Sequence, residues 1–69
     1  MIRDTITDEI RTVDTEGMLE RLIEHTMTED GVDGWSVLYY RTEEGEPVEK
    51  VSESTFVIVK TRRSLSRFV

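Results

Sequence analysis

Apolar residues between positions 15 and 28 recur at helical spacing. Steps of three and four residues place on one side of a helix Met18, Leu19, Leu22, Ile23, Thr26 and Met27. Asp14 or Thr15 is suited to accept the free N–H groups of a first helical turn. The Asp-Gly pairs within residues 30–34 are typical of the turn that follows a helix. We therefore predict a helix over residues 15–28.

Two later segments alternate in the manner of β-strands. Residues 35–41 divide their large side chains between two faces, with Trp35, Val37 and Tyr39 against Leu38 and Tyr40. Residues 55–61 alternate in the same way. Between them lie a polar turn over residues 42–47 and a short extended piece over residues 48–51. Because this connection is too short for a parallel crossover, we expect the two strands to pair antiparallel.

The first 13 residues fit two patterns. Four-residue steps join Ile2, Ile6 and Ile10, as on a helix, yet three threonines in the segment favour a strand. We favour a short strand near residues 8–13. The fold class predicted from the chain is therefore α+β, with one helix packed on a small antiparallel sheet in the order β-α-β-β. Residues 1–61 form the single domain, and residues 62–69 form a basic C-terminal tail.

Composition narrows the chemistry available to the chain. It has 69 residues, no cysteine and one histidine, so disulfides, thiolate sites and a His-rich zinc site are excluded. The acidic loop of Glu29, Asp30 and Asp33 lacks the spacing of an EF-hand and is interpreted as a solvated turn. We expect no metal and no cofactor. No apolar run is long enough to span a bilayer and the N-terminus lacks a signal-peptide layout, so we expect a cytoplasmic protein.

A catalytic site is not expected. His25 could act as a general base beside Glu24, Glu29 or Asp30. A histidine near the end of a helix is favourable there through the helix dipole alone. The serines match no nucleophile elbow, and a core this small leaves little room for an enclosed pocket. We therefore predict that the protein is not an enzyme.

The net charge of −6 is unevenly placed along the chain. Residues 1–60 carry all 15 acids, whereas the last nine residues carry only the basic Arg62, Arg63 and Arg67. An acidic body repels phosphate backbones, which disfavours nucleic-acid binding. Nucleic-acid binding through this basic tail is therefore the alternative hypothesis and not the leading one. A second alternative is that the acidic side chains imitate phosphates and occupy the nucleic-acid channel of a partner protein. The densest group of acids is Glu43, Glu44, Glu46, Glu49 and Glu53. A salt-loving source would also favour such an acidic surface.

Protein binding has the strongest positive support. If one helix covers one face of the sheet, the other face leaves an apolar patch of Leu38, Tyr40, Phe56 and Ile58. Aromatic residues dominate binding hot spots, which favours Tyr40 as an interface residue. The predicted partner-binding set is this patch together with Glu43, Glu44 and Glu46. The partner is an unidentified protein, or a second copy of the chain in a symmetric homo-oligomer.

In size, acidity and element order, a cysteine-free helix-on-sheet chain of this kind resembles the small inhibitors made by bacteriophages and other mobile elements. Those proteins commonly block a host enzyme, including CRISPR effectors and RNA polymerase. The resemblance implies a non-enzymatic module that binds a host nucleic-acid-processing protein, and it assigns no residues.

Overall fold

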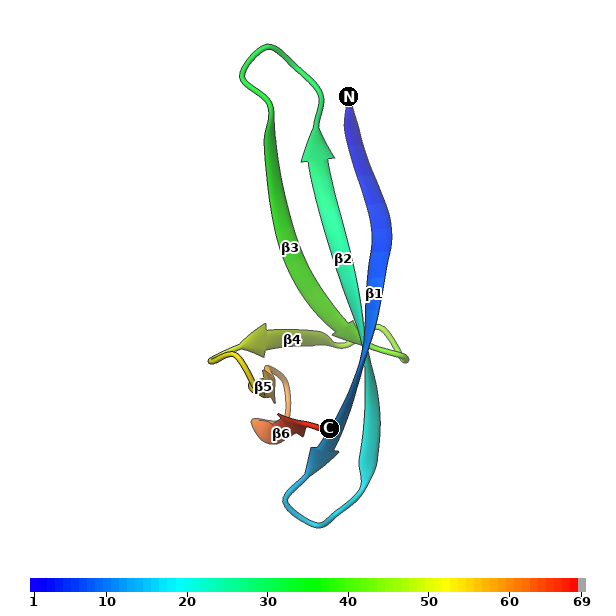
Figure 1. The fold of residues 1–69 in the computed structure, drawn as a ribbon, viewed down its shortest axis with the longest axis vertical. Helices are drawn as coiled ribbons and strands as arrows, with labels where there is room; N and C mark the ends of the chain where they lie inside the picture. Colours follow the sequence, from blue (N-terminus) through cyan, green and yellow to red (C-terminus); the bar gives the residue numbers. More distant parts are fainter. Residues whose placement is uncertain (69) are drawn as a thin grey trace.

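The computed structural model describes residues 1–68 and shows an all-β fold with no helix in that range. Its six strands, in chain order, are β1 (Ile2–Asp14), β2 (Leu19–Glu29), β3 (Trp35–Thr42), β4 (Pro47–Lys50), β5 (Thr55–Ile58) and β6 (Arg63–Arg67). Each strand pairs antiparallel with the next, and β6 returns to pair with β1, so the sheet closes into a barrel (Figure 1). The α+β prediction, with its β-α-β-β order, is therefore wrong.

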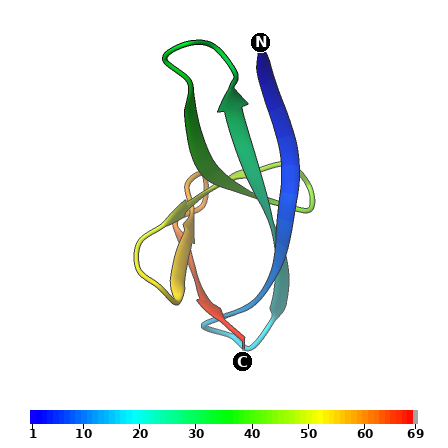
Figure 2. The same ribbon diagram turned by 45° about the horizontal axis from the view of Figure 1, so that its top comes forward.

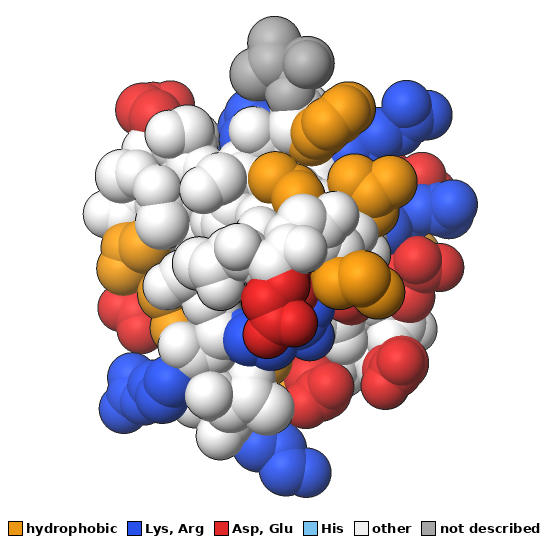
Figure 3. Space-filling model, turned by 90° about the horizontal axis from the view of Figure 1, so that it is seen from below, with side chains coloured by type: hydrophobic (Ala, Val, Ile, Leu, Met, Phe, Trp, Pro, Cys, Tyr) orange, Lys and Arg blue, Asp and Glu red, His pale blue; other side chains and the backbone are white. Residues whose placement is uncertain are grey.

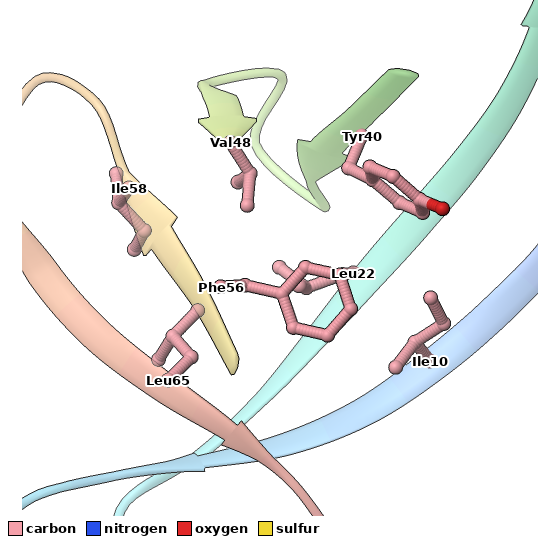
Figure 4. Packing of buried hydrophobic residues seen from close by; sticks show 7 residues of the cluster. All are labelled: Ile10, Leu22, Tyr40, Val48, Phe56, Ile58 and Leu65. Atoms are coloured by element: carbon pink, nitrogen blue, oxygen red, sulfur yellow. The ribbon is translucent and has the colours of Figure 1, made fainter. Parts of the chain in front are cut away.

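The core of the barrel is small and apolar. Seven side chains fill it, contributed by all six strands: Ile10, Leu22, Tyr40, Val48, Phe56, Ile58 and Leu65 (Figure 4). Phe56 lies at the centre, where its ring meets that of Tyr40 edge to face at 5.3 Å. Two buried threonines complete the interior, and both hydroxyls are hydrogen-bonded: Thr12 to the Glu20 carbonyl, Thr42 to the Glu46 N–H.

The segment predicted as a helix is the central strand β2. It pairs along its length with β1 and from Leu22 to Glu29 with β3, so neighbouring strands satisfy most of its backbone groups on both sides. Leu22 points into the barrel, whereas Ile23 lies on the opposite face. The three- and four-residue spacing is therefore accidental. The β-branched residues Ile23, Thr26 and Thr28 favour an extended backbone, and pairing on both sides outweighs a weak helical preference.

Asp14 forms a turn instead of a helix cap. Its Oδ1 accepts the backbone N–H groups of Glu16 at 2.9 Å and Met18 at 2.8 Å, and Gly17 has a positive φ of 84°. Its Oδ2 accepts a 2.6 Å bond from the Arg63 guanidinium on β6. The same side chain thus shapes the β1–β2 turn and ties β1 to the last strand.

These bonds make stability depend on pH. Donation from the Met18 N–H, and then from Arg63, lowers the pKa of Asp14 below its ordinary value of 3.8. A group whose pKa is lowered on folding stabilises the folded state. The stabilisation is complete at pH values above the ordinary pKa and is lost as the pH falls through the lowered pKa. Asp14→Asn should therefore lower the urea midpoint at neutral pH, and its difference from wild type should narrow below about pH 4. Glu44→Gln, at an exposed turn position, should keep the wild-type profile.

The strand at residues 35–41 and the polar turn after it are confirmed as β3 and the β3–β4 turn. The second predicted strand is confirmed in part, because β5 ends at Ile58. Direct pairing of these two strands is wrong, since β4 lies between them and pairs with both. The short extended piece is therefore a full member of the barrel. The favoured strand at residues 8–13 lies within the longer β1.

The predicted basic tail belongs to the barrel. β6 pairs with β5 on one side and with β1 on the other, and its Leu65 is completely buried. The boundary placed at residue 62 is therefore wrong for residues 63–67, and Val69 lies outside the described residues. Across residues 1–68, no helix is long and apolar enough to cross a membrane.

Candidate functional site: a three-stranded arm

Half of the first three strands extends beyond the barrel. The extension, here called the arm, comprises residues 1–8 and 24–39 and ends at the β2–β3 turn and the N-terminus (Figures 1 and 2). It makes the molecule elongated, with principal extents of 46 × 24 × 21 Å. The register runs without interruption from Ile2↔Glu29 to Ile6↔His25 in β1 and β2, and from Glu29↔Trp35 to His25↔Tyr39 in β2 and β3.

One face of the arm is apolar and uncovered. It continues the outer surface of the barrel and is called the apolar arm face. Its residues are Ile2, Asp4, Ile6, His25, Met27, Glu29, Trp35, Val37 and Tyr39. Four of them are large apolar residues with 43–64% of their surface exposed: Ile2, Ile6, Trp35 and Val37. An apolar group of this size on a small protein is typical of an interaction surface.

A polar trio fixes the middle of this face, with one residue from each strand. Asp4 on β1 lies 3.3 Å from the Nδ1 of His25 on β2, and its other oxygen accepts the hydroxyl hydrogen bond of Tyr39 on β3. The His25 and Tyr39 rings stack at 4.7 Å, and the Arg41 guanidinium lies over the tyrosine ring at 5.5 Å from its centroid. The bond to Asp4 raises the pKa of Tyr39. The trio therefore holds the three strands in a preset arrangement.

The three side chains of the trio form contacts between neighbouring strands and hold those strands together. Asp4 orients the imidazole of His25, as a carboxylate does beside a catalytic histidine, but no serine, threonine or cysteine is hydrogen-bonded to that ring among residues 1–68. All three side chains lie on an open sheet face. The histidine that the sequence placed at a helix end is thus a cross-strand contact.

The opposite face of the arm is rich in hydroxyl groups and is called the threonine face. It consists of Arg3, Thr5, Thr7, Glu24, Thr26, Thr28, Ser36 and Leu38. Thr7 bonds Thr26 at 3.0 Å and Glu24 at 2.8 Å, and Glu24 in turn accepts a 3.3 Å bond from the Tyr40 hydroxyl. This network links the arm to the core residue Tyr40. Leu38 is the exposed apolar exception, at 56%.

The net charge of the molecule is concentrated in the arm. The arm holds six carboxylates and one arginine, for a net charge of −5, whereas the remaining residues hold nine carboxylates and eight basic side chains. Figure 3 shows the barrel end, where basic and acidic side chains are interspersed with apolar ones. The excess negative charge of the arm arises because it holds one basic side chain, whereas acids are distributed over the whole molecule.

The four residues of the predicted apolar patch do not share one surface in the structure. Tyr40, Phe56 and Ile58 are core residues, at most 7% exposed, and only Leu38 lies on the surface. The expectation of an uncovered face formed by these four residues is therefore wrong. The alternation along β3 was correct, but the closed barrel buries Tyr40 and exposes Trp35, which the helix-on-sheet prediction would have buried.

The predicted charged sites are dispersed. Glu43 and Glu44 are exposed in the β3–β4 turn, where Glu43 lies 3.8 Å from Arg21, and Glu46 closes the same turn. Arg63 bonds Asp14, and Arg67 lies over the Phe56 ring, so both hold β6 in place. Arg62 occupies the β5–β6 turn with a positive φ of 62°. The arginines do not form a free basic segment.

The part of the chain that the structure describes holds no metal cluster that marks another site. Across residues 1–68 no group of three metal-ligating side chains is found, and the acidic loop is used internally, with Asp30 bonded to Arg3. A hollow of about 350 Å³ lies by the barrel, lined by Arg11, Thr12, Leu19, Glu20, Arg21, Glu43 and Phe68. Its two arginines and two glutamates balance, so it selects for neither sign of charge.

The arm residues that the sequence interpretation missed carry one readable signal. Ile2, Asp4 and Ile6 alternate with Arg3, Thr5 and Thr7, and His25 and Met27 alternate with threonines, which is the period of a strand with unlike faces. Comparisons with protein-family models, curated proteins and solved structures found no match to this chain. The function must therefore be argued from the arm itself.

Proposed function

We propose that this chain is a non-enzymatic protein-binding module that docks on a basic partner protein through the apolar arm face. The observation that carries the proposal is a rigid sheet surface with large apolar side chains exposed on it. Trp35, with 43% of its surface exposed, is the anchor. Tryptophan is the residue type most enriched among binding hot spots, because a large flat side chain fills a pocket at low entropic cost.

The charge of the arm specifies the chemistry of the partner. Asp4 lies within the apolar arm face and Glu29 at its end, and Asp30 and Asp33 follow in the adjoining turn. Exposed apolar residues with an acidic border fit a partner whose apolar pocket is rimmed by lysine or arginine. Proteins that hold nucleic acid present such basic surfaces, which makes them the first class of partner to test.

Preorganisation supports the same proposal. Binding surfaces that are already fixed lose little conformational entropy on association. The Asp4–His25–Tyr39 trio and the ion pair between the Met1 amino group and Glu29, at 2.9 Å, hold the three strands and the N-terminus in place. The arm therefore offers a surface of defined shape instead of a mobile hairpin.

The test compares two exposed aromatic residues at opposite ends of the molecule. Wild type, Trp35→Ala and Phe68→Ala are immobilised and used to capture proteins from a lysate of the source cells, and each captured protein is then purified and titrated. Phe68, 53% exposed beside the barrel, is the matched control. A true partner should bind Trp35→Ala at least tenfold more weakly, which corresponds to a hot-spot loss above about 1.4 kcal/mol. It should bind Phe68→Ala as tightly as wild type.

Two further readouts locate the contact. Hydrogen exchange should slow in β1, β2 and β3 of the arm when the partner binds, and affinity should fall as salt rises, because the acidic border contributes. A partner that binds all three variants equally, or that protects only the barrel, would contradict the proposal. So would the absence of any protein whose binding depends on Trp35.

A further inference from the structure

The arm has two open edges, and they differ in chemistry. Between Trp35 and Tyr39, β3 pairs only with β2, because β4 joins β3 only at Tyr40 and Arg41. Among the described residues, the edge of β1 is also unpaired from Ile2 to Ile10, because the Phe68 N–H bonds the Arg11 carbonyl and β6 begins to pair at Thr12. Each edge presents backbone N–H and C=O groups that an added strand would satisfy.

The β1 edge carries the features that block strand addition. Its residues include Arg3, Asp4, Asp8 and Glu9, and the register shifts between Ile6 and Asp8 as in a β-bulge. Charges and bulges are the usual protection of an edge strand. The β3 edge has neither: the sequence from Trp35 to Tyr39 is Trp-Ser-Val-Leu-Tyr, without charge, proline or glycine. One edge is therefore protected and the other is open for pairing.

The open edge is self-complementary. We infer that residues 35–39 of β3 pair antiparallel with the same residues of a second copy, about a two-fold axis at Val37. In this register Trp35 lies opposite Tyr39 of the second copy, and Ser36 lies opposite Leu38 of the second copy. Directly opposed residues of an antiparallel pair share a face, and each of these pairs keeps that rule. Aromatic cross-strand pairs are among the favourable ones.

The antiparallel arrangement also suits the charges. It places the acidic tip of each arm at the opposite end of the joined sheet, farther from its copy than the roughly 8–10 Å over which salt screens charge. The same register directs the turn containing Asp33 of one copy toward the end of β3 that carries Arg41 of the other. A parallel arrangement would bring the acidic tips together. Charge complementarity thus selects the antiparallel dimer, in which six arm strands form one continuous sheet.

The absence of cysteine from the chain makes a direct test available. In the inferred dimer the two Val37 side chains lie about 4.5–5.5 Å apart at their Cβ atoms, within reach of a disulfide after a small adjustment. The two Ile6 side chains lie on the outermost strands, about 24 Å apart at 4.8 Å per strand. Val37→Cys should therefore form an intermolecular disulfide under mild oxidation. Ile6→Cys, at a more exposed position on the same face, should remain monomeric at the same concentration.

A second pair of variants tests association without a crosslink. Light scattering and sedimentation of the purified wild type should show a concentration-dependent dimer below about 1 mM. Val37→Lys places like charges opposite each other at the two-fold axis and should weaken the dimer at least tenfold, whereas Ile6→Lys should not. Circular dichroism confirms that each variant is folded, and Val37→Thr, neutral and suited to strands, should dimerise.

Three results would overturn the inference: a wild type that stays monomeric throughout this range, equal crosslinking of the two cysteine variants, or equal dimerisation of the two lysine variants. A monomeric wild type whose capture of another protein is lost in Val37→Lys would also overturn it, because Val37 lies on the apolar arm face as well as at the β3 edge. The inference does not depend on the proposed function, because these measurements use the purified chain alone.

Discussion

Phe56→Ala should strongly lower the urea midpoint of the protein. The Phe56 side chain is completely buried at the centre of the core and contacts Tyr40. Removing a buried phenylalanine side chain costs about 3–5 kcal/mol through lost burial and the cavity left behind. A chain of 69 residues has a free energy of unfolding of roughly 3–10 kcal/mol in total. One substitution should therefore remove a third or more of the stability, and in many conditions all of it.

Circular dichroism during urea unfolding measures this effect. Phe68→Ala is the control, because it deletes the same side chain at a position where 53% of the residue is exposed. Its unfolding midpoint should stay close to that of wild type. Similar losses in the two variants would mean that Phe56 is not at the centre of the core, and the closed barrel would then be in doubt.

Truncation after Thr61 should abolish folding. It removes β6, which pairs with β5 through four residue pairs and with β1 through three. It also removes Leu65 from the core and Arg63, the partner of Asp14. An open five-stranded sheet would expose two unpaired edges and one side of the core. The truncated chain should therefore lack the cooperative thermal transition of the full chain and should aggregate during purification.

A chain that ends at Arg67 separates this effect from a simple loss of length. It keeps every residue of β6 and loses one backbone hydrogen bond, from the Phe68 N–H to the Arg11 carbonyl. It should fold cooperatively with a modestly lower midpoint. A folded, monomeric chain truncated after Thr61 would instead support the interpretation of residues 62–69 as a tail.

Sequence periodicity located β3 well and failed at β2 for a physical reason. The large side chains of residues 35–41 alternate between two faces, a pattern that does not suit a helix, and β3 forms there. In β2, the core-facing side contains Leu22 but also Glu20 and Glu24, so the strand pattern is weak. The strand is defined by β1 and β3 on either side of it, and pairing between distant segments leaves no local signal. Gly17 was the local clue, because a positive φ suits a turn and not a first helical turn.

The candidate site was predictable in its residue types but not in its location. Aromatic residues on β3 indicated an interface, and the structure exposes Trp35 where the prediction exposed Tyr40. Which face of a strand becomes the core depends on closure of the sheet, and closure depends on β6, where Leu65 gave the only apolar signal within the strand. The concentration of net negative charge in the arm was equally hidden, because its residues come from two separated segments of the chain.

Strands β1 and β2 run from the barrel into the arm without a glycine or a proline. Arm and barrel therefore share the same two backbones, and neither segment can melt without loosening the other. A ligand held at the tip should raise the melting temperature of the whole molecule, with a gain that follows the logarithm of its concentration above the dissociation constant. Conversely, a destabilising substitution deep in the barrel, far from any contact with the ligand, should weaken ligand binding by disordering the arm. Thermal shift then becomes a sensitive assay for whatever binds there.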